Sequence, residues 1–503
     1  MNIVEAIDDP EVFGSNFRDP ESWAAWRAFL AALFALPMTP AELATYRACS
    51  GRTDAPTSPH TEAWLVCGRR AGKSYTLALI AVYLACFRDW RPHLAPGERA
   101  TVMVIAADRK QARVILRYVH GLLTAVPMLA GTIEREATEA IDLSNRVSIE
   151  VNTASFRTTR GYSIAAALCD EIAYWPTDDS ASPDTEILAA LRPAMATLPG
   201  ALLLCASSPY SRRGALWQAH QRHHGKDGSP VLVWQAATRT MNPSVPQHIV
   251  DEALAADPAH ARAEYLAEFR SDVESYVRHE AVAVLVPPGC RERPPSSDIE
   301  YFAFVDPSGG SADSMTLAIG HKAGDTVVLD ALRERRPPFS PEGVVQEFAA
   351  LLHRYGLSEV TGDRYAGEWP REQFRKRGID YELSPLSKSD LYRDLLPVIN
   401  SAQADLLDDD RLVSQLTGLE RRTARGGRDT IDHGPGGHDD VANAAAGCLV
   451  LAHTAGANRL RSGRTSTMGG PQSLLVSSRP QPQPVFSPPH EWRHHPHFRR
   501  YFK

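Results

Sequence analysis

The strongest constraint on how this chain can fold is an apolar run that leads directly into a short glycine-containing loop. Residues 64–66 are Trp-Leu-Val, residues 67–74 read Cys-Gly-Arg-Arg-Ala-Gly-Lys-Ser, and a helical pattern begins at Tyr75. A strand, a tight loop ending in Gly-Lys-Ser and a helix form a cradle in which backbone amides and the helix N-terminus face an anion. In such a cradle Lys73 neutralises the charge of the β- and γ-phosphates, and the Ser74 hydroxyl holds Mg2+. The residues predicted to bind a nucleotide are Gly68, Arg69, Gly72, Lys73 and Ser74.

A second element is needed, because position 67 is Cys where the usual phosphate-binding loop has Gly, and Gly-Lys-Ser also occurs by chance. The apolar run 164–169 supplies this element, since it ends in Asp170 and Glu171. At the end of such a strand the first acid holds Mg2+ and the second polarises the attacking water. The alternative is a buried strand followed by a solvated acidic turn. The loop and the acidic pair together favour an NTPase, with Asp170 among the nucleotide-binding residues.

Two further features extend the predicted nucleotide site. Phosphoryl transfer needs a cation on the developing charge, and Arg69 and Arg70 lie inside the loop, where one of them can act in cis. The alternative is that both arginines contact solvent or a neighbouring acid. Ser207 and Ser208 follow the apolar run 201–206, at a position where a loop can sense the γ-phosphate. Taken alone, this is an ordinary turn from strand to loop.

Breaks in the sequence pattern divide the 503 residues into two folded parts and a tail. In the first part short apolar runs alternate with helical patterns, which favours a mostly parallel sheet covered by helices. The proline-rich stretch that follows can continue neither a helix nor a central strand, so it is predicted to be a linker. Three closely spaced strand candidates, 301–305, 315–320 and 326–332, and then alternating units suggest a second, mixed α/β sheet. The predicted parts are 1–286, the linker 287–297, 298–455 and the tail 456–503.

The charge of the chain is unevenly distributed. The formal net charge is −6, so contact with nucleic acid must come from local basic patches. Residues 459–503 have seven Arg and one Lys against one Glu and no apolar periodicity, which predicts a disordered basic tail. A cationic loop at 421–428 is expected to hold a phosphate backbone by charge, the alternative being a solvated loop. Its candidate DNA-binding residues are Arg421, Arg422, Arg425 and Arg428. No membrane segment is expected, because that needs about 20 mostly apolar residues in a row.

Acids in the second part follow strand candidates and open a helix. Asp306 ends the strand candidate 302–305, Asp363 ends the strand candidate 360–362, and Asp439 and Asp440 precede the helical run 441–451. Such a set can hold two divalent cations roughly 3.5–4 Å apart, which activate water and stabilise the leaving oxygen in phosphodiester cleavage. Oxygen ligands suit Mg2+ or Mn2+. The alternative is that the acids are plain turn residues.

The two acids of the doublet are not equivalent. Neighbouring helical residues point about 100° apart, so only one of them is expected to face the metals directly. The apolar stripe of the helix lies closer to Asp440 than to Asp439. This favours Asp440 as the inner ligand, with Asp439 capping the helix or binding through water.

Taken together and in this order, the motifs resemble the large terminase subunit of tailed bacteriophages, the motor that packages DNA into a capsid. That family joins a P-loop ATPase domain to a ribonuclease H-like nuclease domain, and the resemblance implies both folds here. It also implies a cis-acting role for Arg69, Mg2+ binding by Asp170 and a catalytic base at Glu171. The remaining implied residues are the coupling pair Ser207 and Ser208, and the metal-binding triad of Asp306, Asp363 and the doublet Asp439/Asp440. Residues 240–243 and 263–269 are similar to the end of the family's ATPase domain.

The expected function is that ATP hydrolysis drives double-stranded DNA into a procapsid, while the nuclease cuts concatemeric DNA. The cofactors would be ATP and Mg2+, with Mg2+ or Mn2+ at the nuclease site. The resemblance implies a portal protein and a small terminase subunit as partners, a homo-oligomeric ring, and a place in the cytoplasm of a bacterial host. Two alternatives remain open: another nucleic-acid motor such as a helicase-like repair ATPase, and a non-catalytic assembly factor switched by nucleotide.

Overall fold

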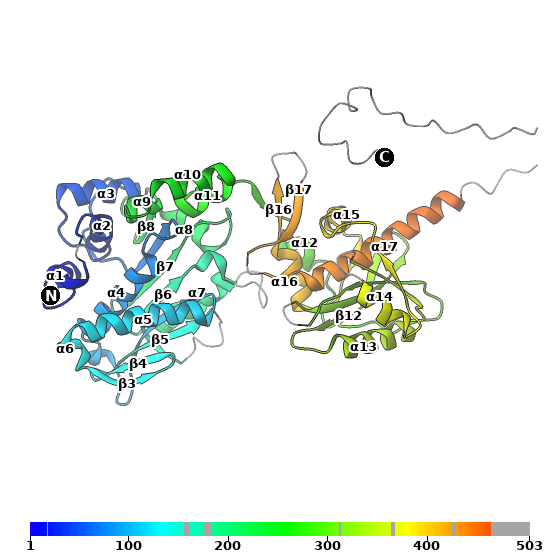
Figure 1. Cartoon of the computed structure of the whole chain (residues 1–503), viewed down its shortest axis with the longest axis horizontal. Helices are drawn as coiled ribbons and strands as arrows, with labels where there is room; N and C mark the ends of the chain where they lie inside the picture. The colour runs from blue at the N-terminus through cyan, green and yellow to red at the C-terminus, as the bar shows by residue number, and fades with distance from the viewer. Residues whose placement is uncertain are drawn as a thin grey trace, which may run out of the picture. The chain divides into compact units, whose positions relative to one another are not determined.

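The computed structural model of the chain is an α/β structure, with its helices and strands labelled in Figure 1. By the contacts between its residues, Met1–Gly456 form one unit. The described residues are 1–17, 19–154, 161–175, 183–310, 313–363, 368–423, 429–435 and 437–463. Most of the second unit, Ala457–Lys503, lies outside them, and so does most of the predicted basic tail. No helix in the described part has the length and the hydrophobicity that crossing a bilayer requires.

The first sheet has eight strands in the order β3-β4-β5-β2-β6-β7-β1-β8. Every neighbouring pair from β5 to β8 is parallel, whereas β3 and β4 add an antiparallel edge. The carboxyl ends of parallel strands meet at one edge of a sheet, so the residues that follow β1, β6 and β7 come together there. The strands are β1 (Glu62–Cys67), β2 (Ala100–Ala106), β3 (Ile133–Ala137), β4 (Ala140–Leu143), β5 (Val147–Thr153), β6 (Ser163–Asp170), β7 (Leu202–Ser207) and β8 (Val231–Ala236).

The helix that follows β1 is apolar on almost every side, and such a helix must be covered on every side. This helix, α4 (Lys73–Cys86), is buried from Thr76 to Ala85. It packs against α5 (Arg109–Ala125), which has one apolar face. The other helices of this region are α1 (Ile3–Asp8), α2 (Ala24–Leu33), α3 (Pro40–Ser50), α6 (Pro127–Ala130), α7 (Pro183–Met195), α8 (Gly214–His223), α9 (Thr238–Met241), α10 (Gln247–Ala256) and α11 (Pro258–Leu266).

The second sheet has six strands in the order β14-β13-β10-β11-β12-β15. Its first three strands in the chain are antiparallel neighbours, and β13 and β14 then continue the sheet parallel to β10. The predicted α/β fold class, with a mostly parallel sheet followed by a mixed one, is therefore confirmed. The strands are β10 (Tyr301–Asp306), β11 (Met315–Ala323), β12 (Thr326–Arg335), β13 (Glu359–Gly362), β14 (Asp380–Leu383) and β15 (Ala404–Asp405).

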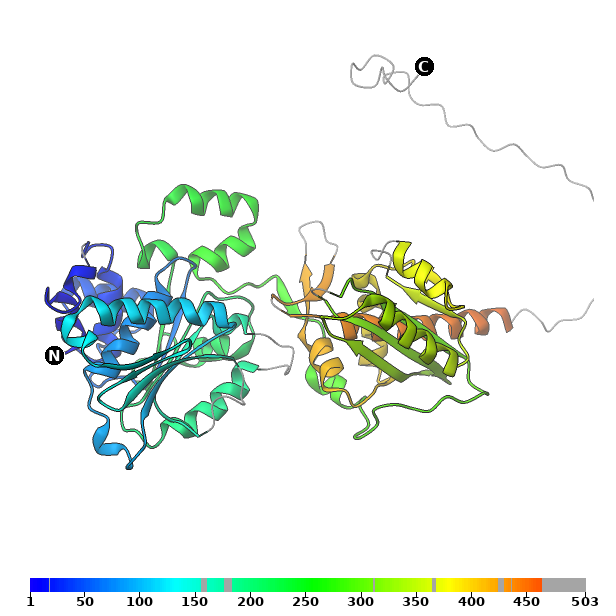
Figure 2. The same ribbon diagram turned by 60° about the horizontal axis from the view of Figure 1, so that its bottom comes forward.

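Helices cover both faces of the second sheet. Successive residues of a strand point to opposite faces, and in this sheet the residues on each face are apolar. Val305 of β10 belongs to a core that includes helix α13 (Pro341–Arg354), whereas its neighbour Phe304 belongs to a second core. The second core includes α15 (Lys388–Asn400), α16 (Asp410–Gly418) and α17 (Asp440–Gly463), and α17 runs along the sheet (Figure 2). The remaining helices are α12 (His279–Ala283) and α14 (Glu368–Arg375).

A third, small sheet corrects one expectation. The cationic segment predicted as a flexible loop begins with strand β16 (Leu419–Thr423), which carries Arg421 and Arg422. β16 pairs antiparallel with both β17 (Asp429–His433) and β9 (Val273–Ser275). Pairing on both sides satisfies the backbone of β16, which charge composition alone does not reveal. Arg425 and Arg428 lie outside the described residues.

The stretch predicted as a linker is attached to the second sheet. The backbone N–H of Arg293 donates to Asp330, and its guanidinium lies 2.7 Å from Asp405. Earlier in the chain, Tyr276 and Leu285 are buried in the core that contains α15 and α17. The packing of the second part thus begins at β9, before residue 286.

Gly447 lets α17 pack closely on β10, and this contact generates a stability prediction. A Cβ added at Gly447 would lie 2.3 Å from the ring of Phe304, so Gly447→Ala must displace the helix or the ring. We expect the free energy of unfolding to fall by about 1–3 kcal/mol, as is usual for overpacking. Urea unfolding of the full chain measures this change.

The matched control is Gly121→Ala on α5, where an added Cβ meets no atom within 4 Å. Alanine is the better helix former, so this change should stabilise by about 0.5–1 kcal/mol. Equal effects of the two substitutions would contradict the close approach of α17 to β10.

Candidate nucleotide and metal sites

The loop after β1 has the geometry of an anion cradle. Gly72, with φ of 104°, turns the chain into α4, and Lys73 is the first residue of that helix. The Lys73 ammonium group folds back into the loop, where it lies 3.1 Å from the carbonyl oxygen of Cys67 and 3.3 Å from that of Gly68. Its side chain is only 5% exposed. The lysine is therefore held over the loop by backbone carbonyls that a residue of any type supplies, so Cys67 fits there as well as Gly.

The acidic pair predicted beyond the loop lies beside it. The Ser74 hydroxyl donates to Oδ2 of Asp170 at 3.1 Å, and Lys73 Nζ lies 3.2 Å from Oε1 of Glu171. Burial, and then the charge of Glu171, raise the pKa of Asp170. The second oxygen of Asp170, Oδ1, is buried without a hydrogen-bond partner among the described residues. A buried carboxylate oxygen without a hydrogen-bond partner, beside a serine hydroxyl, is a suitable ligand for a Mg2+ ion.

The predicted coupling residues contact the predicted base. Glu171 has a left-handed backbone, with φ of 49°. Its Oε2 accepts a hydrogen bond from the Ser207 hydroxyl at 3.1 Å and another from the backbone N–H of Ser208 at 3.2 Å. These two bonds fix the carboxylate at the end of β7. A movement of the 207–208 segment therefore acts directly on Glu171.

Arg69 is held through its backbone as well as its side chain. Its carbonyl accepts from the Thr238 hydroxyl at 2.7 Å, and its N–H donates to the carbonyl of Glu264. Its guanidinium lies 3.5 Å from the Glu264 carboxylate but is 66% exposed. The carboxylate also accepts from the Tyr174 hydroxyl at 2.9 Å. The cis-acting role of Arg69 stays a prediction.

Three residues that shape the loop were given no role from the sequence: Trp26, Asn242 and Glu264. The Trp26 indole N–H donates to the carbonyl of Ala71 at 2.9 Å, and Asn242 donates to that of Arg70. Asn242 and Glu264 lie within the segments 240–243 and 263–269, so the family resemblance pointed at them without giving them a role. No local pattern marks Trp26, because its partner is 45 residues away.

The structure brings together the acids predicted to hold metal ions. Asp306 ends β10, Asp363 follows β13, and Asp440 begins α17. These three and Asp439 line one cavity of about 760 Å³. The neighbouring strands β10 and β13 are parallel, which places the first two acids at the same sheet edge.

The cavity disfavours the charged form of carboxylates that have no cation beside them. Burial, and then the charges of Asp440, Asp363 and Asp439, raise the pKa of Asp306 well above its usual range, against the hydrogen bond from Asn443. Burial, and next the charge of Asp439, raise the pKa of Asp440 to about 6. Carboxylates that lie close together and out of water repel one another unless cations neutralise them. This set of oxygen donors therefore fits divalent metal ions.

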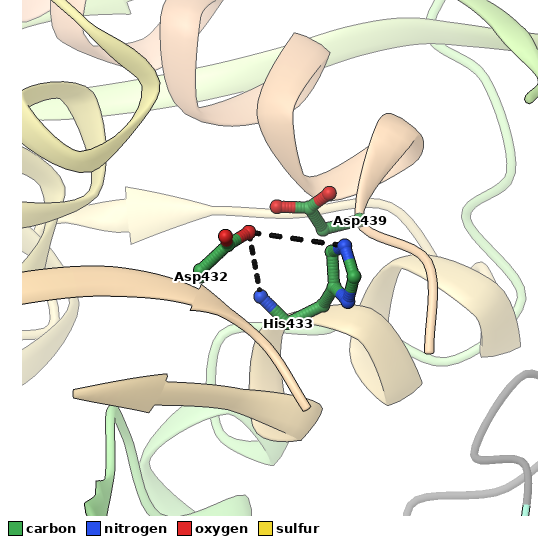
Figure 3. A group of neighbouring side chains, drawn as sticks. All are labelled: Asp432, His433 and Asp439. Carbon is green, nitrogen blue, oxygen red and sulfur yellow. Dashed lines mark hydrogen bonds and ion pairs between the residues drawn. The ribbon is translucent and has the colours of Figure 1, made fainter. Parts of the chain in front are cut away.

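Asp439 differs from Asp440 in its partners. Figure 3 shows Asp439 beside Asp432 and His433, and the possible ligand atoms of these three residues lie within 4.8 Å of one another. Lys388 Nζ lies 2.8 Å from Oδ1 of Asp432 and 3.0 Å from Oδ2 of Asp439. Lys388 was not predicted from the sequence. A protein cation therefore already lies between the two carboxylates.

The predicted DNA-binding arginines that are described have acidic partners. Arg421 pairs with Asp429 across the β16–β17 hairpin. Arg422 lies 3.2 Å from Oε2 of the fully buried Glu420 and donates to the carbonyl of His433. Their predicted contact with DNA is not tested by this arrangement.

Part of the first sheet region matches a family model. A family model described as "Terminase large subunit, T4likevirus-type, N-terminal" matches residues 65–182. The matched segment contains Lys73, Asp170 and Glu171, and it confirms the predicted resemblance to terminase large subunits. A comparison with curated proteins finds no match.

Three solved structures that are similar to the chain are bacteriophage proteins. The large terminase of bacteriophage HK97 is 15% identical with a TM-score of 0.40, and the alignment covers 90% of this chain and 99% of that chain. The large terminase of a thermophilic bacteriophage in complex with ADP is 12% identical with a TM-score of 0.35, covering 78% and 95%. The large terminase nuclease of thermophilic phage G20c with bound magnesium is 18% identical with a TM-score of 0.31, covering 35% and 96%.

The hydrogen bond from Trp26 to the loop generates a prediction about nucleotide affinity. Trp26→Phe keeps the buried ring but leaves the carbonyl of Ala71 without its donor, so the loop becomes less well ordered. We expect the affinity for ATP to fall about tenfold, equivalent to about 1.4 kcal/mol. Titration with a fluorescent ATP analogue measures it.

Trp90→Phe is the matched control, because the buried Trp90 indole also donates to a backbone carbonyl, that of Leu84 at 2.8 Å. Each substitution should cost about 1 kcal/mol of stability. A loss of affinity of the same size in both variants would show that the Trp26 contact has no special role at the loop.

Proposed function

We propose that this chain is a terminase large subunit that uses ATP hydrolysis to translocate double-stranded DNA into a procapsid and cuts concatemeric DNA with a metal-dependent endonuclease. The observation that carries the proposal is the presence of two separate acidic sites in one chain. Asp170 and Glu171 stand beside a phosphate cradle on the first sheet, and Asp306, Asp363 and Asp440 line a cavity on the second. The family match over residues 65–182 supports the same conclusion.

In the proposed ATPase site each residue has one task. Lys73 neutralises phosphate charge, and Ser74 and Asp170 would hold Mg2+, which would supply further neutralisation of the phosphate charge. Glu171, oriented by Ser207 and Ser208, accepts a hydrogen bond from the attacking water. Arg69 contributes positive charge in cis once it leaves Glu264. Gly68 and Gly72 allow the loop to approach the phosphates closely.

In the proposed nuclease site the chain supplies a carboxylate surface for Mg2+ or Mn2+. When bound, such ions activate water and stabilise the leaving oxygen. Asp306, Asp363 and Asp440 hold them, and Asn443 orients Asp306 through its hydrogen bond of 2.8 Å. The cavity is lined on another side by Trp369, a large exposed side chain beside which a DNA strand can lie.

The remaining parts of the proposal concern DNA and partners. Arg421, Arg422, Arg425 and Arg428 would contribute positive charge, which favours contact with phosphates without sequence readout. Packaging would involve a homo-oligomeric ring docked on the procapsid in the cytoplasm of a bacterial host. A portal protein and a small terminase subunit would be its partners.

We also propose that the two activities belong to two domains joined by a short linker. The sequence suggested 1–286 and 298–455. The burial of Tyr276 and Leu285 in the second core favours a first domain that ends near residue 272.

The two-site proposal is tested by removing one residue from each site. Lys73→Ala takes away the charge that binds phosphate, so ATP hydrolysis should fall by about 10²-fold or more while metal-dependent nicking of DNA persists. Asp363→Ala should reduce nicking by a similar factor and leave ATP hydrolysis intact. Phosphate release and plasmid nicking by the full chain, measured in Mg2+ and in Mn2+, give both rates.

Lys110→Ala and Asp380→Ala are controls of the same residue types at exposed positions. Loss of both activities in either site variant, with the fold intact by circular dichroism, would contradict two separate sites. Unwinding of a DNA duplex would favour a helicase-like motor instead. Absence of ATP turnover in the unaltered chain would favour a nucleotide-switched assembly factor.

A further inference from the structure

Lys388 stands at the edge of the acidic cavity, where it contacts one member of the acidic doublet. It is the first residue of α15, a helix begun by a capping box between Ser387 and Asp390. Its ammonium group lies 2.8 Å from Asp432 and within 3.0–3.2 Å of both oxygens of Asp439. The side chain is 30% exposed and lines the cavity. Contacts with both carboxylates thus hold the ammonium group in place.

Asp439 has all of its acceptor atoms engaged by this helix. One turn after Lys388, the fully buried Tyr392 donates its hydroxyl to Oδ2 of Asp439 at 2.9 Å. Residues four apart share one face of a helix, so α15 presents a cation and a hydroxyl to the same carboxylate. The Asp439 side chain is 7% exposed, so little water reaches it. A buried carboxylate with these partners is already satisfied.

Asp440 is placed differently. Among the described residues, its Oδ2 accepts a long hydrogen bond, 3.3 Å, from the backbone N–H of Ser314, and its carbonyl accepts from the Thr316 hydroxyl. Within the described residues no lysine or arginine forms an ion pair with its carboxylate. Asp440 and Asp306 line the same cavity. In the part of the chain that the structure describes, Asp440 is thus the member of the doublet that has no lysine or arginine partner.

We propose that Lys388 is a positioning residue that takes the place of a metal ion between Asp432 and Asp439, so that Asp440, and not Asp439, holds the divalent cation of the cavity. This inference rests on the proposed metal-dependent nuclease. It divides the doublet into one acid that is neutralised by the protein and one that is kept for the ion. Lys388 also limits the number of cations, because Asp432, His433 and Asp439 would otherwise form a ligand set of their own.

The alternative is that Lys388 forms a salt bridge that only stabilises the fold. The two interpretations differ in what happens when the ammonium group is removed. An ordinary salt bridge would leave a weakened structure with unchanged metal binding. A lysine that stands in for an ion would leave an acidic, imidazole-containing pocket, and such a pocket binds Mn2+.

The test counts Mn2+ ions bound to the nucleotide-free full chain, by electron paramagnetic resonance of free Mn2+ and by calorimetry. Asp440→Asn should weaken Mn2+ binding at least about tenfold, whereas Asp439→Asn should leave it within about threefold of the unaltered chain. Lys388→Met should bind one additional Mn2+ ion. That ion should disappear when Asp439→Asn is added to Lys388→Met. Lys388→Arg, which keeps a cation, and Lys376→Met, which breaks an exposed pair with Glu372, should bind as the unaltered chain does.

Two outcomes would overturn the inference. One is that Asp439→Asn weakens Mn2+ binding as much as Asp440→Asn does. The other is that folded Lys388→Met gains no ion. If Lys388→Met fails to fold, the comparison of the two asparagine variants decides alone. Asp306→Asn separates this inference from the proposed function. Unchanged Mn2+ binding in that variant would show that the cavity is not the metal site, and the proposed metal-dependent nuclease would then be wrong independently of Lys388.

Discussion

The cost of placing carboxylates out of water governs both acidic sites of this molecule. A buried carboxylate must be neutralised, hydrogen-bonded or paired with a cation, since an isolated charge in the interior is prohibitively expensive. Burial raises the pKa of Asp170 on the first sheet and of Asp306 and Asp440 on the second. The protein supplies a lysine beside only part of each cluster, and divalent ions would supply the remaining positive charge.

Parallel strands explain why the acids gather in these places. A parallel sheet brings the carboxyl ends of neighbouring strands to one edge, where the backbone changes direction and polar side chains are tolerated. On the first sheet this geometry places Ser207 next to the acidic pair that follows β6. On the second it places Asp306 beside Asp363, and α17 adds the third acid by packing on β10 through Gly447. The apolar cores thus determine the distances on which the chemistry depends.

Much of the site could be predicted from the sequence because its signals are local. Lys73 and Ser74 lie in one short motif, and Asp170 and Asp306 end apolar runs that are recognisable as strands. Lys388 and Trp26 could not be predicted, since their partners are 51 and 45 residues away and are joined to them only by the tertiary fold. The strand β16 was missed for a related reason. Its charged residues resemble a loop, and only pairing with β9 and β17 makes it a strand. Local sequence patterns indicate secondary-structure elements and candidate ligand residues. The side chains that neutralise those ligands come from distant segments, so only the packing of the fold reveals them.

A continuous set of contacts leads from the first acidic site towards the second. Ser207 and Ser208 hold Glu171, and shortly after them the Tyr210 hydroxyl donates at 2.6 Å to Glu420 on β16. Glu420 is fully buried and also pairs with Arg213 and Arg422. Removing one partner of a buried ion pair typically costs about 3–5 kcal/mol. The segment that holds Glu171 cannot move away from β16 without a cost of this order. A displacement of the segment therefore has to move the hairpin with it or break the cluster. Because the hairpin ends in Asp432 and His433, beside Lys388, this constraint extends to the charges that surround Asp439.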